Sequence, residues 1–144
     1  MRTTAPALER TVVRQVFPLW SIAIPATLQE TFVEQDAYWH AWDQHRSASL
    51  TSILIADRRG RPVPPRKILK QVPAMPGQRV DMPLGLAGWA VVITQPPPAR
   101  ASRAISGIVV RDGGLLLATV TADDLGWAER VWRSIRLHQT GASR

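Results

Sequence analysis

The chain of 144 residues contains no cysteine. It can therefore form no disulfide, and it has no thiolate to act as a nucleophile or a metal ligand. It also has no run approaching the roughly 18 apolar residues that a membrane-spanning helix requires. Its first residues contain no apolar segment of the kind found in secretory signals. We therefore expect a soluble, cytoplasmic protein that does not insert into a membrane.

Lysine is scarce as well, since only two of the 18 basic residues are Lys in a chain of net charge +7. Such a charge attracts phosphates or acidic partners. The basic stretch from Arg58 to Lys70 lacks interleaved aromatic residues and any known nucleic-acid motif. We therefore interpret it as a solvated basic face, with nucleic-acid contact as the alternative. This basic patch consists of Arg58, Arg59, Arg61, Arg66, Lys67 and Lys70.

The length and the 45% of apolar residues are those of one globular domain with a real core. We expect that domain to span residues 11–138. Residues 1–10 lack a pattern and residues 139–144 are mostly small and polar, so both ends are expected to be flexible tails.

In the first half of the chain, alternating or β-branched residues predict strands at Val12–Val16 and Trp20–Ile24. The segment Thr31–Gln44 fits either a helix or a strand. Because aromatic side chains suit a pleated surface, we favour a strand over Tyr38–Asp43. It would pair, through a turn, with a second strand over Ser49–Ala56.

The second half begins with a short helix predicted over Pro62–Gln71, whose prolines can occupy its first turn. The proline- and glycine-containing segment 73–86 is expected to be a loop. An apolar strand follows at Trp89–Thr94, and three prolines at 96–98 predict an extended connector.

The clearest local pattern is two apolar strands, Ile105–Val110 and Leu115–Thr121, on either side of a turn at Asp112-Gly113. A helix over Asp123–Arg136 should follow, with Thr121 and Asp124 forming a capping box. The predicted fold class is therefore α+β: an antiparallel β-sheet with a short middle helix and a C-terminal helix packed on it.

This layout resembles the PsbP-like superfamily. The resemblance runs over roughly residues 19–136, from the strand ending Ile22-Ala23-Ile24-Pro25 to the helix ending Ser134-Ile135-Arg136. The superfamily includes photosystem accessory proteins, a Ran-binding import factor and bacterial chaperones of secreted effectors. The resemblance implies an antiparallel sheet flanked by helices and action by binding other proteins. It implies no catalytic residues.

The segment from Tyr38 to Ile53 holds the densest set of aromatic, ionisable and hydroxyl side chains. On a helix, Asp36, His40 and Asp43 would share one face and could bind a divalent cation. If the segment is a strand, that metal site does not form, and we expect neither a metal nor a cofactor.

A second alternative is a small-molecule-binding protein or hydrolase that uses this hairpin. Ser47, Ser49 or Ser52 would be the nucleophile, activated by His40 or His45. The sequence contains no Gly-x-Ser-x-Gly elbow and no oxyanion-hole signature, so we favour hydroxyl groups paired across strands.

We therefore interpret the chain as a non-enzymatic binding module for a protein or peptide partner, and the sequence leaves its oligomeric state open. On a strand, Trp39 and Trp42 point to opposite faces, so one indole should be accessible as an anchor. The expected partner-binding residues are Tyr38, Trp39, His40, Trp42 and His45.

Overall fold

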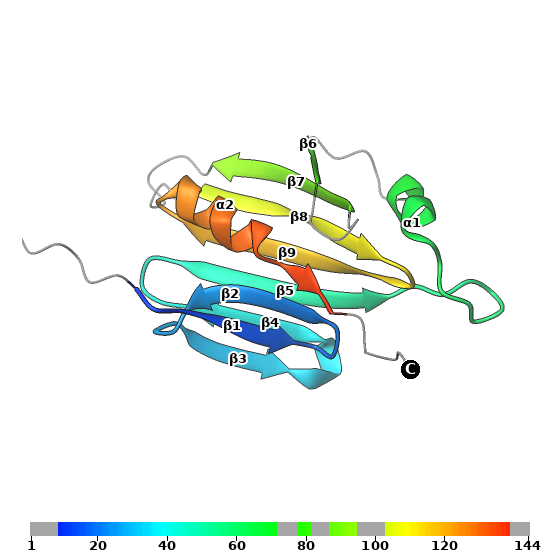
Figure 1. Cartoon of the computed structure of the whole chain (residues 1–144), viewed down its shortest axis with the longest axis horizontal. Coiled ribbons are helices and arrows are strands. Elements are labelled where there is room, and N and C mark those ends of the chain that lie inside the picture. The colour runs from blue at the N-terminus through cyan, green and yellow to red at the C-terminus, as the bar shows by residue number, and fades with distance from the viewer. Residues whose placement is uncertain (1–8, 72–77, 82–86, 95–102, 139–144) are drawn as a thin grey trace, which may run out of the picture.

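The computed structural model describes the backbone of residues 9–71, 78–81, 87–94 and 103–138, and the side chains of 9–70 and 104–138. Within these residues the chain forms two antiparallel sheets and two α-helices (Figure 1). The elements are β1 (Thr11–Val16), β2 (Trp20–Pro25), β3 (Gln29–Val33), the 3-10 helix η1 (Glu34–Asp36), β4 (Tyr38–Trp42), β5 (Ser47–Leu54), α1 (Pro65–Gln71), β6 (Gln78–Asp81), β7 (Ala87–Thr94), β8 (Arg103–Arg111), β9 (Gly114–Ala122), α2 (Leu125–Arg133) and β10 (Arg136–Leu137).

The larger sheet has seven strands in the order β3-β4-β5-β9-β8-β7-β6, and the smaller has three in the order β1-β2-β10. Every pairing between these strands is antiparallel. The expected α+β class, with a short middle helix and a C-terminal helix packed on an antiparallel sheet, is confirmed.

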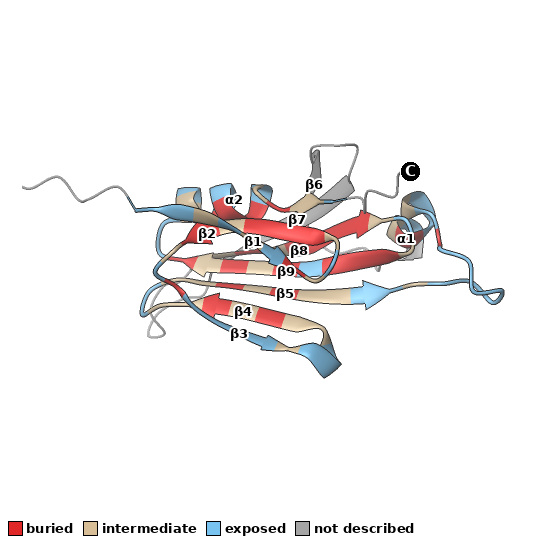
Figure 2. Cartoon of the chain, turned by 60° about the horizontal axis from the view of Figure 1, so that its bottom comes forward, coloured by how far each residue is buried: buried red, intermediate tan, exposed pale blue. Residues whose placement is uncertain are grey.

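One face of the seven-stranded sheet packs against the three-stranded sheet and α2; we call it the covered face. Alternate residues of β4, β5, β8 and β9 point into this layer, because successive side chains of a strand alternate between faces. Figure 2 shows buried positions along strands of both sheets and on α2. The side chains that fill the layer include Trp20, Ile22, Ile24, Leu28, Trp39, Leu50, Ile105, Leu116, Val120, Val131, Trp132 and Ile135.

We call the opposite side of the seven-stranded sheet the open face. Among the described elements, only α1 packs on it, at the end where β8 turns into β9. A small second core forms there, because Ile68 of α1 and Val63 cover Ile108, Val110 and Leu115. The remaining length of β4, β5 and β9 carries no described helix on this face.

The predicted hairpin with its turn at Asp112-Gly113 is confirmed, and Gly113 has the positive φ of +80° that such a turn requires. The predicted capping box is wrong. Thr121 still belongs to β9, and α2 begins two residues later than expected. Its N-cap is Asp124, whose carboxylate accepts a hydrogen bond from the Trp127 backbone N–H at 3.2 Å.

The expected loop at 73–86 contains the strand β6, which pairs with β7 along four residues. The ambiguous segment divides into parts of three elements: β3, η1 and β4. The proline connector at 96–98 lies outside the described residues, as do residues 1–8 and 139–144 of the expected tails. Glu9 and Arg10 of the N-terminal tail are held in place, since Arg10 accepts a backbone hydrogen bond from Ala26.

None of the helices in the described part of the chain is long and apolar enough to cross a membrane.

Candidate functional site

Strand β4 carries four of the five residues that the sequence predicted to bind a partner. Its pleat divides them between the two faces of the sheet. Trp39 points to the covered face and is 4% exposed. Tyr38, His40 and Trp42 point to the open face and are partly exposed. The expectation that the two indoles lie on opposite faces is therefore confirmed, and Trp42 is the accessible one.

The three open-face side chains of β4 form a continuous aromatic row. The Tyr38 and His40 rings lie 6.1 Å apart between centroids. The His40 and Trp42 rings are stacked at 4.9 Å with an angle of 23° between their planes. Both centroid distances lie within the range of about 4.5–7 Å that is usual for aromatic pairs, so the row presents a continuous aromatic surface.

Hydroxyl and apolar side chains continue the open face beside this row. The strand register places Ser49 beside His40 and Thr119 beside Ser49, and the Thr119 and Ser106 hydroxyls hydrogen-bond at 2.9 Å. Ile53 and Leu117 add exposed apolar area, at 39% and 41% exposure.

No Asp, Glu, Lys or Arg points to the open face from the described positions of β3, β4, β5, β8 and β9. The positions that do point there follow from the register and are Gln29, Thr31, Val33, Tyr38, His40, Trp42, Ser47, Ser49, Thr51, Ile53, Ala104, Ser106, Ile108, Val110, Leu115, Leu117, Thr119 and Thr121.

The serines and histidines proposed for a hydrolase lie at different places on the hairpin. Ser49 lies opposite His40 in the strand register, with no hydrogen bond between their side chains among the described residues. Ser52 points to the opposite face of β5, and His45 lies exposed in the turn after β4. A general base must come within hydrogen-bond reach of the proton that it removes, and among the described residues neither His40 nor His45 is hydrogen-bonded to a serine of this hairpin.

A serine–histidine contact that the sequence did not indicate joins β2 to the C-terminal end of the described chain. The hydroxyl Oγ of Ser21 and Nε2 of His138 lie 2.6 Å apart, although 117 positions separate the residues. Ser21 is only 2% exposed, so a substrate carbonyl cannot approach its hydroxyl. We interpret the contact as an anchor for β10, which pairs with β2 through Arg136 and Leu137.

The acids proposed for a metal site are separated by the strand. Asp36 lies in η1, His40 on the open face, and Asp43 in the turn after β4. Within the described residues, no three His, Asp or Glu side chains are grouped so that they could hold a metal ion.

Asp43 instead belongs to an ion-pair cluster centred on Arg46. The Arg46 guanidinium donates to both carboxylate oxygens of Glu9 at 2.6 and 2.7 Å, and to Asp43 Oδ2 at 2.7 Å. It also lies over the Trp127 ring, 4.9 Å from the centroid. The cluster thus connects the segment before β1, the β4–β5 turn and α2.

The charged groups in this cluster shift one another's pKa values. The Arg46 hydrogen bonds hold the pKa of Glu9 below its ordinary value, against a smaller opposing effect of burial. Burial acts to raise the pKa of Asp43, but hydrogen bonds from the Arg46 side chain and from the backbone N–H groups of His45 and Arg46 together lower it. Bidentate contact with Glu9 in turn raises the pKa of Arg46.

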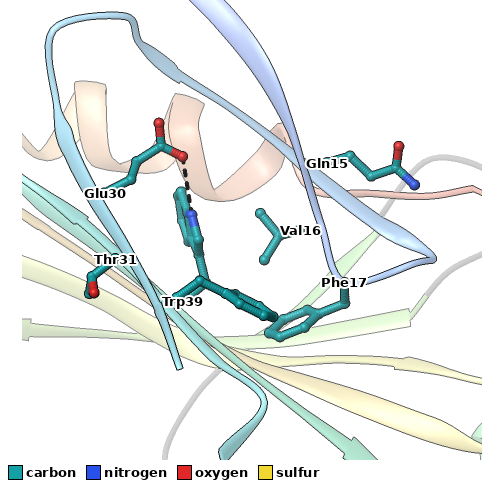
Figure 3. Close-up of a pocket in the computed structure, with 7 residues that line it drawn as sticks. Gln15, Val16, Phe17, Glu30, Thr31 and Trp39 are labelled. Carbon is teal, nitrogen blue, oxygen red and sulfur yellow. Dashed lines mark hydrogen bonds between the residues drawn. The ribbon is translucent and has the colours of Figure 1, made fainter. Parts of the chain in front are cut away.

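On the covered side, a cavity of about 340 Å³ opens between the end of β1 and strand β3 (Figure 3). Its walls include the rings of Phe17, Phe32 and Trp39. The Trp39 indole N–H donates to Glu30 Oε1 at 3.2 Å, and Arg14 pairs with the other oxygen of Glu30 at 2.8 Å. A polar rim thus adjoins an aromatic interior, which the sequence did not indicate because its residues come from three separate strands and a turn.

A second cavity of about 420 Å³ lies between β2 and α2, near Glu9, Trp127 and Arg130. Tyr38, His40 and Trp42 of the aromatic row line neither of these two cavities.

All six cations of the basic patch are exposed, in the loop between β5 and α1 and on α1 itself. Asp57 orders this loop by accepting hydrogen bonds from the backbone N–H groups of Arg59 and Arg61. The loop extends beyond the end of the sheet (Figure 1), away from the aromatic row on β4.

No protein-family model matches the chain, and a search of curated proteins finds no related sequence.

Proposed function

We propose that the protein is a non-enzymatic binding module whose open face recognises a protein or peptide partner. The observation that supports this most is the chemistry of that face. It combines an aromatic row with exposed aliphatic and hydroxyl side chains, and the open-face positions of β3, β4, β5, β8 and β9 carry no acid, lysine or arginine.

This composition differs from that of the whole chain, in which 20% of residues are charged. The centres of protein interfaces are depleted in charged residues and enriched in Tyr and Trp. Tyr and Trp also contribute large contact areas at a small cost in side-chain entropy, and Ser and Thr supply adaptable hydrogen bonds. The open face matches this combination.

The shape of the face favours a macromolecule over a small ligand. Small-molecule sites are concave and enclose most of the ligand. The aromatic row lies on an extended sheet surface, and the two cavities described above lie on the other side of the sheet. The layout resemblance to the PsbP-like superfamily, whose members mostly bind other proteins, supports the same proposal.

The roles of the nominated residues follow from their positions. Trp42 and Tyr38 are the proposed anchors, since both are aromatic and partly exposed. His40 holds the row together by stacking on Trp42. Trp39 belongs to the core, and His45 lies in the turn beside the row.

Site-specific photo-crosslinking in the native host tests the proposal. A photoreactive residue is placed at Ser49, in the centre of the open face, and in a matched control at Val13, which is 68% exposed on β1. We expect a crosslinked partner from Ser49 and not from Val13. The partner, once purified, should bind Trp42→Ala at least about thirtyfold more weakly than wild type, as expected for a hot-spot anchor.

Crosslinks formed equally from Val13, or none from Ser49, would contradict the proposal. So would an unchanged affinity in both Trp42→Ala and Tyr38→Ala. The melting temperature of each variant is measured first, so that a loss of binding is not mistaken for a loss of fold.

A further inference from the structure

A separate feature is strand β3, which lies beside the cavity between the two sheets. This strand is the edge of the seven-stranded sheet, and four of its five residues are exposed. Within the described residues, no backbone group pairs with its outer edge. An edge strand without a partner presents a row of N–H and C=O groups that another extended segment can satisfy.

The aromatic cavity lies directly beside this edge. Phe32 of β3 is 50% exposed, and its ring lies 5.5 Å from that of Phe17 between centroids. Phe17 has a φ of +61°, a left-handed conformation that is unfavourable for a residue with a side chain. Backbone strain of this kind is concentrated at binding sites, where the surrounding structure holds a side chain in a required place. Here it directs the Phe17 ring to the cavity wall (Figure 3).

The segment around β3 has a net charge opposite in sign to that of the whole chain. Residues 27–36 include three acids and no Lys or Arg, although the net charge of the chain is +7. Glu30 is paired with Arg14, but Glu34 and Asp36 form no ion pair with the described residues and are exposed. The edge of β3 therefore ends in unneutralised negative charge.

We propose that β3 accepts an extended peptide strand that carries basic residues at its ends and inserts one aromatic or large apolar side chain into the cavity. Main-chain hydrogen bonds to β3 would supply affinity, and the cavity would select the side chain, as in other cases of strand addition. Arginine or lysine of the peptide would pair with Glu34 and Asp36.

A second copy of the chain fits this edge less well. Two β3 strands paired antiparallel in the register centred on Phe32 would place Glu30 of one copy opposite Glu34 of the other, and like charges across a strand pair are destabilising. The site is also distinct from the open face, so this proposal and the proposed function can fail independently.

Binding is measured by fluorescence anisotropy with a labelled synthetic peptide of alternating Thr and Val, with Arg at both ends and Phe in the centre. A first matched probe has Asp in place of the central Phe. A second matched probe is N-methylated at the alternate amides along one edge, which removes the hydrogen-bond donors that strand pairing needs. We expect the Phe probe to bind wild type, and both matched probes to lose at least about tenfold in affinity.

Two variants assign the site. The double change Glu34→Lys with Asp36→Lys should weaken the Phe probe at least about tenfold, because it reverses exposed charge without disturbing the core. Phe17→Gly should weaken it as well while relieving the positive φ, so the fold is retained. Trp42→Ala, on the other face, should bind the probe like wild type.

Three results would overturn the proposal. Equal affinity for the N-methylated probe would mean that the cavity binds a side chain without strand pairing. A dimer in sedimentation that Phe32→Ser dissociates would mean that a second copy covers β3. No binding of the Phe probe at about 1 mM would mean that the edge accepts no such strand.

Discussion

Strand β4 has five residues, which point alternately to its two faces. The two faces differ in exposure and chemistry. Trp39 and Ala41 on the covered face are 4% and 0% exposed and belong to the core. Tyr38, His40 and Trp42 on the open face are partly exposed and stack on one another. One strand therefore supplies both stability and a surface for recognition, and the pleat decides which residue does which.

The largest difference between the two faces is expected for the pair of variants Trp39→Ala and Trp42→Ala. Trp39→Ala removes a buried indole and its hydrogen bond to Glu30, so we expect the free energy of unfolding to fall by about 3–5 kcal/mol. Trp42→Ala removes a partly exposed ring and should cost about 1 kcal/mol. Chemical denaturation of both variants measures the difference. Equal losses would show that the two faces are equally important to the fold.

The next test concerns the end of the open face that α1 covers. Gly113 has a φ of +80°, and a Cβ added there would lie 2.9 Å from the Cβ of Pro62, just before α1. Gly113→Ala should therefore lower the free energy of unfolding by about 2–3 kcal/mol. Gly60→Ala is the matched control, because its φ is +78° and nothing lies within 4 Å. Gly60→Ala should lower the free energy of unfolding by about 1 kcal/mol, because only its positive φ is unfavourable for alanine. Similar losses in thermal unfolding would rule out the contact with Pro62 as a cause.

A smaller effect is expected at the turn that joins β4 to β5 and is held to α2 by Arg46. Arg46→Met should lower the free energy of unfolding at neutral pH by about 1 kcal/mol, as is usual for partly exposed ion pairs. The folded state lowers the pKa values of Glu9 and Asp43, so their contribution is present above the ordinary values of 4.5 and 3.8. It is lost as the pH falls through the lowered values.

Denaturation measured from neutral to acid pH checks this linkage. The difference between wild type and Arg46→Met should shrink as the pH falls below about 4, because protonated carboxyl groups no longer pair with Arg46. A difference that stays constant across this range would assign the effect of Arg46 to its packing over Trp127.

The smallest effect is expected in the middle of the open face. Ser49→Ala removes a hydroxyl that lies beside His40 without a hydrogen bond to it, so stability should change by no more than about 0.5 kcal/mol. Ala48→Ser, on the next residue and the covered face, introduces a hydroxyl at a position that is 0% exposed and should cost clearly more. Thermal unfolding of this adjacent pair compares the two faces within one dipeptide.

Much of this fold was predictable from local patterns. Alternation and β-branching located β1, β2 and β5, and Asp112-Gly113 located the β8–β9 turn. The opposite directions of Trp39 and Trp42 followed from the pleat once β4 was assigned as a strand. These features depend on neighbours in the sequence, so the sequence was sufficient to predict them.

The features that the sequence did not reveal depend on distant contacts. Strand β3 is mostly polar and exposed, and it is defined by its pairing with β4 and not by its own pattern. The start of α2 could not be assigned correctly because both Thr121 and Asp124 are good caps, and the pairing of β9 with β5 keeps Thr121 extended. The aromatic cavity could not be foreseen because Phe17, Phe32 and Trp39 meet only after the layers pack.

The pairing of β10 with β2 has a consequence for the order of events during synthesis. Leu137 lies beside Trp20, so the three-stranded sheet is completed by some of the last described residues of the chain. A ribosome that has released only the first half of the chain exposes a β1–β2 hairpin whose apolar side still lacks β9 and α2. Such long-range closure slows folding and leaves apolar surface open to other chains in the meantime. We therefore expect nascent chains truncated before α2 to aggregate or to require a chaperone.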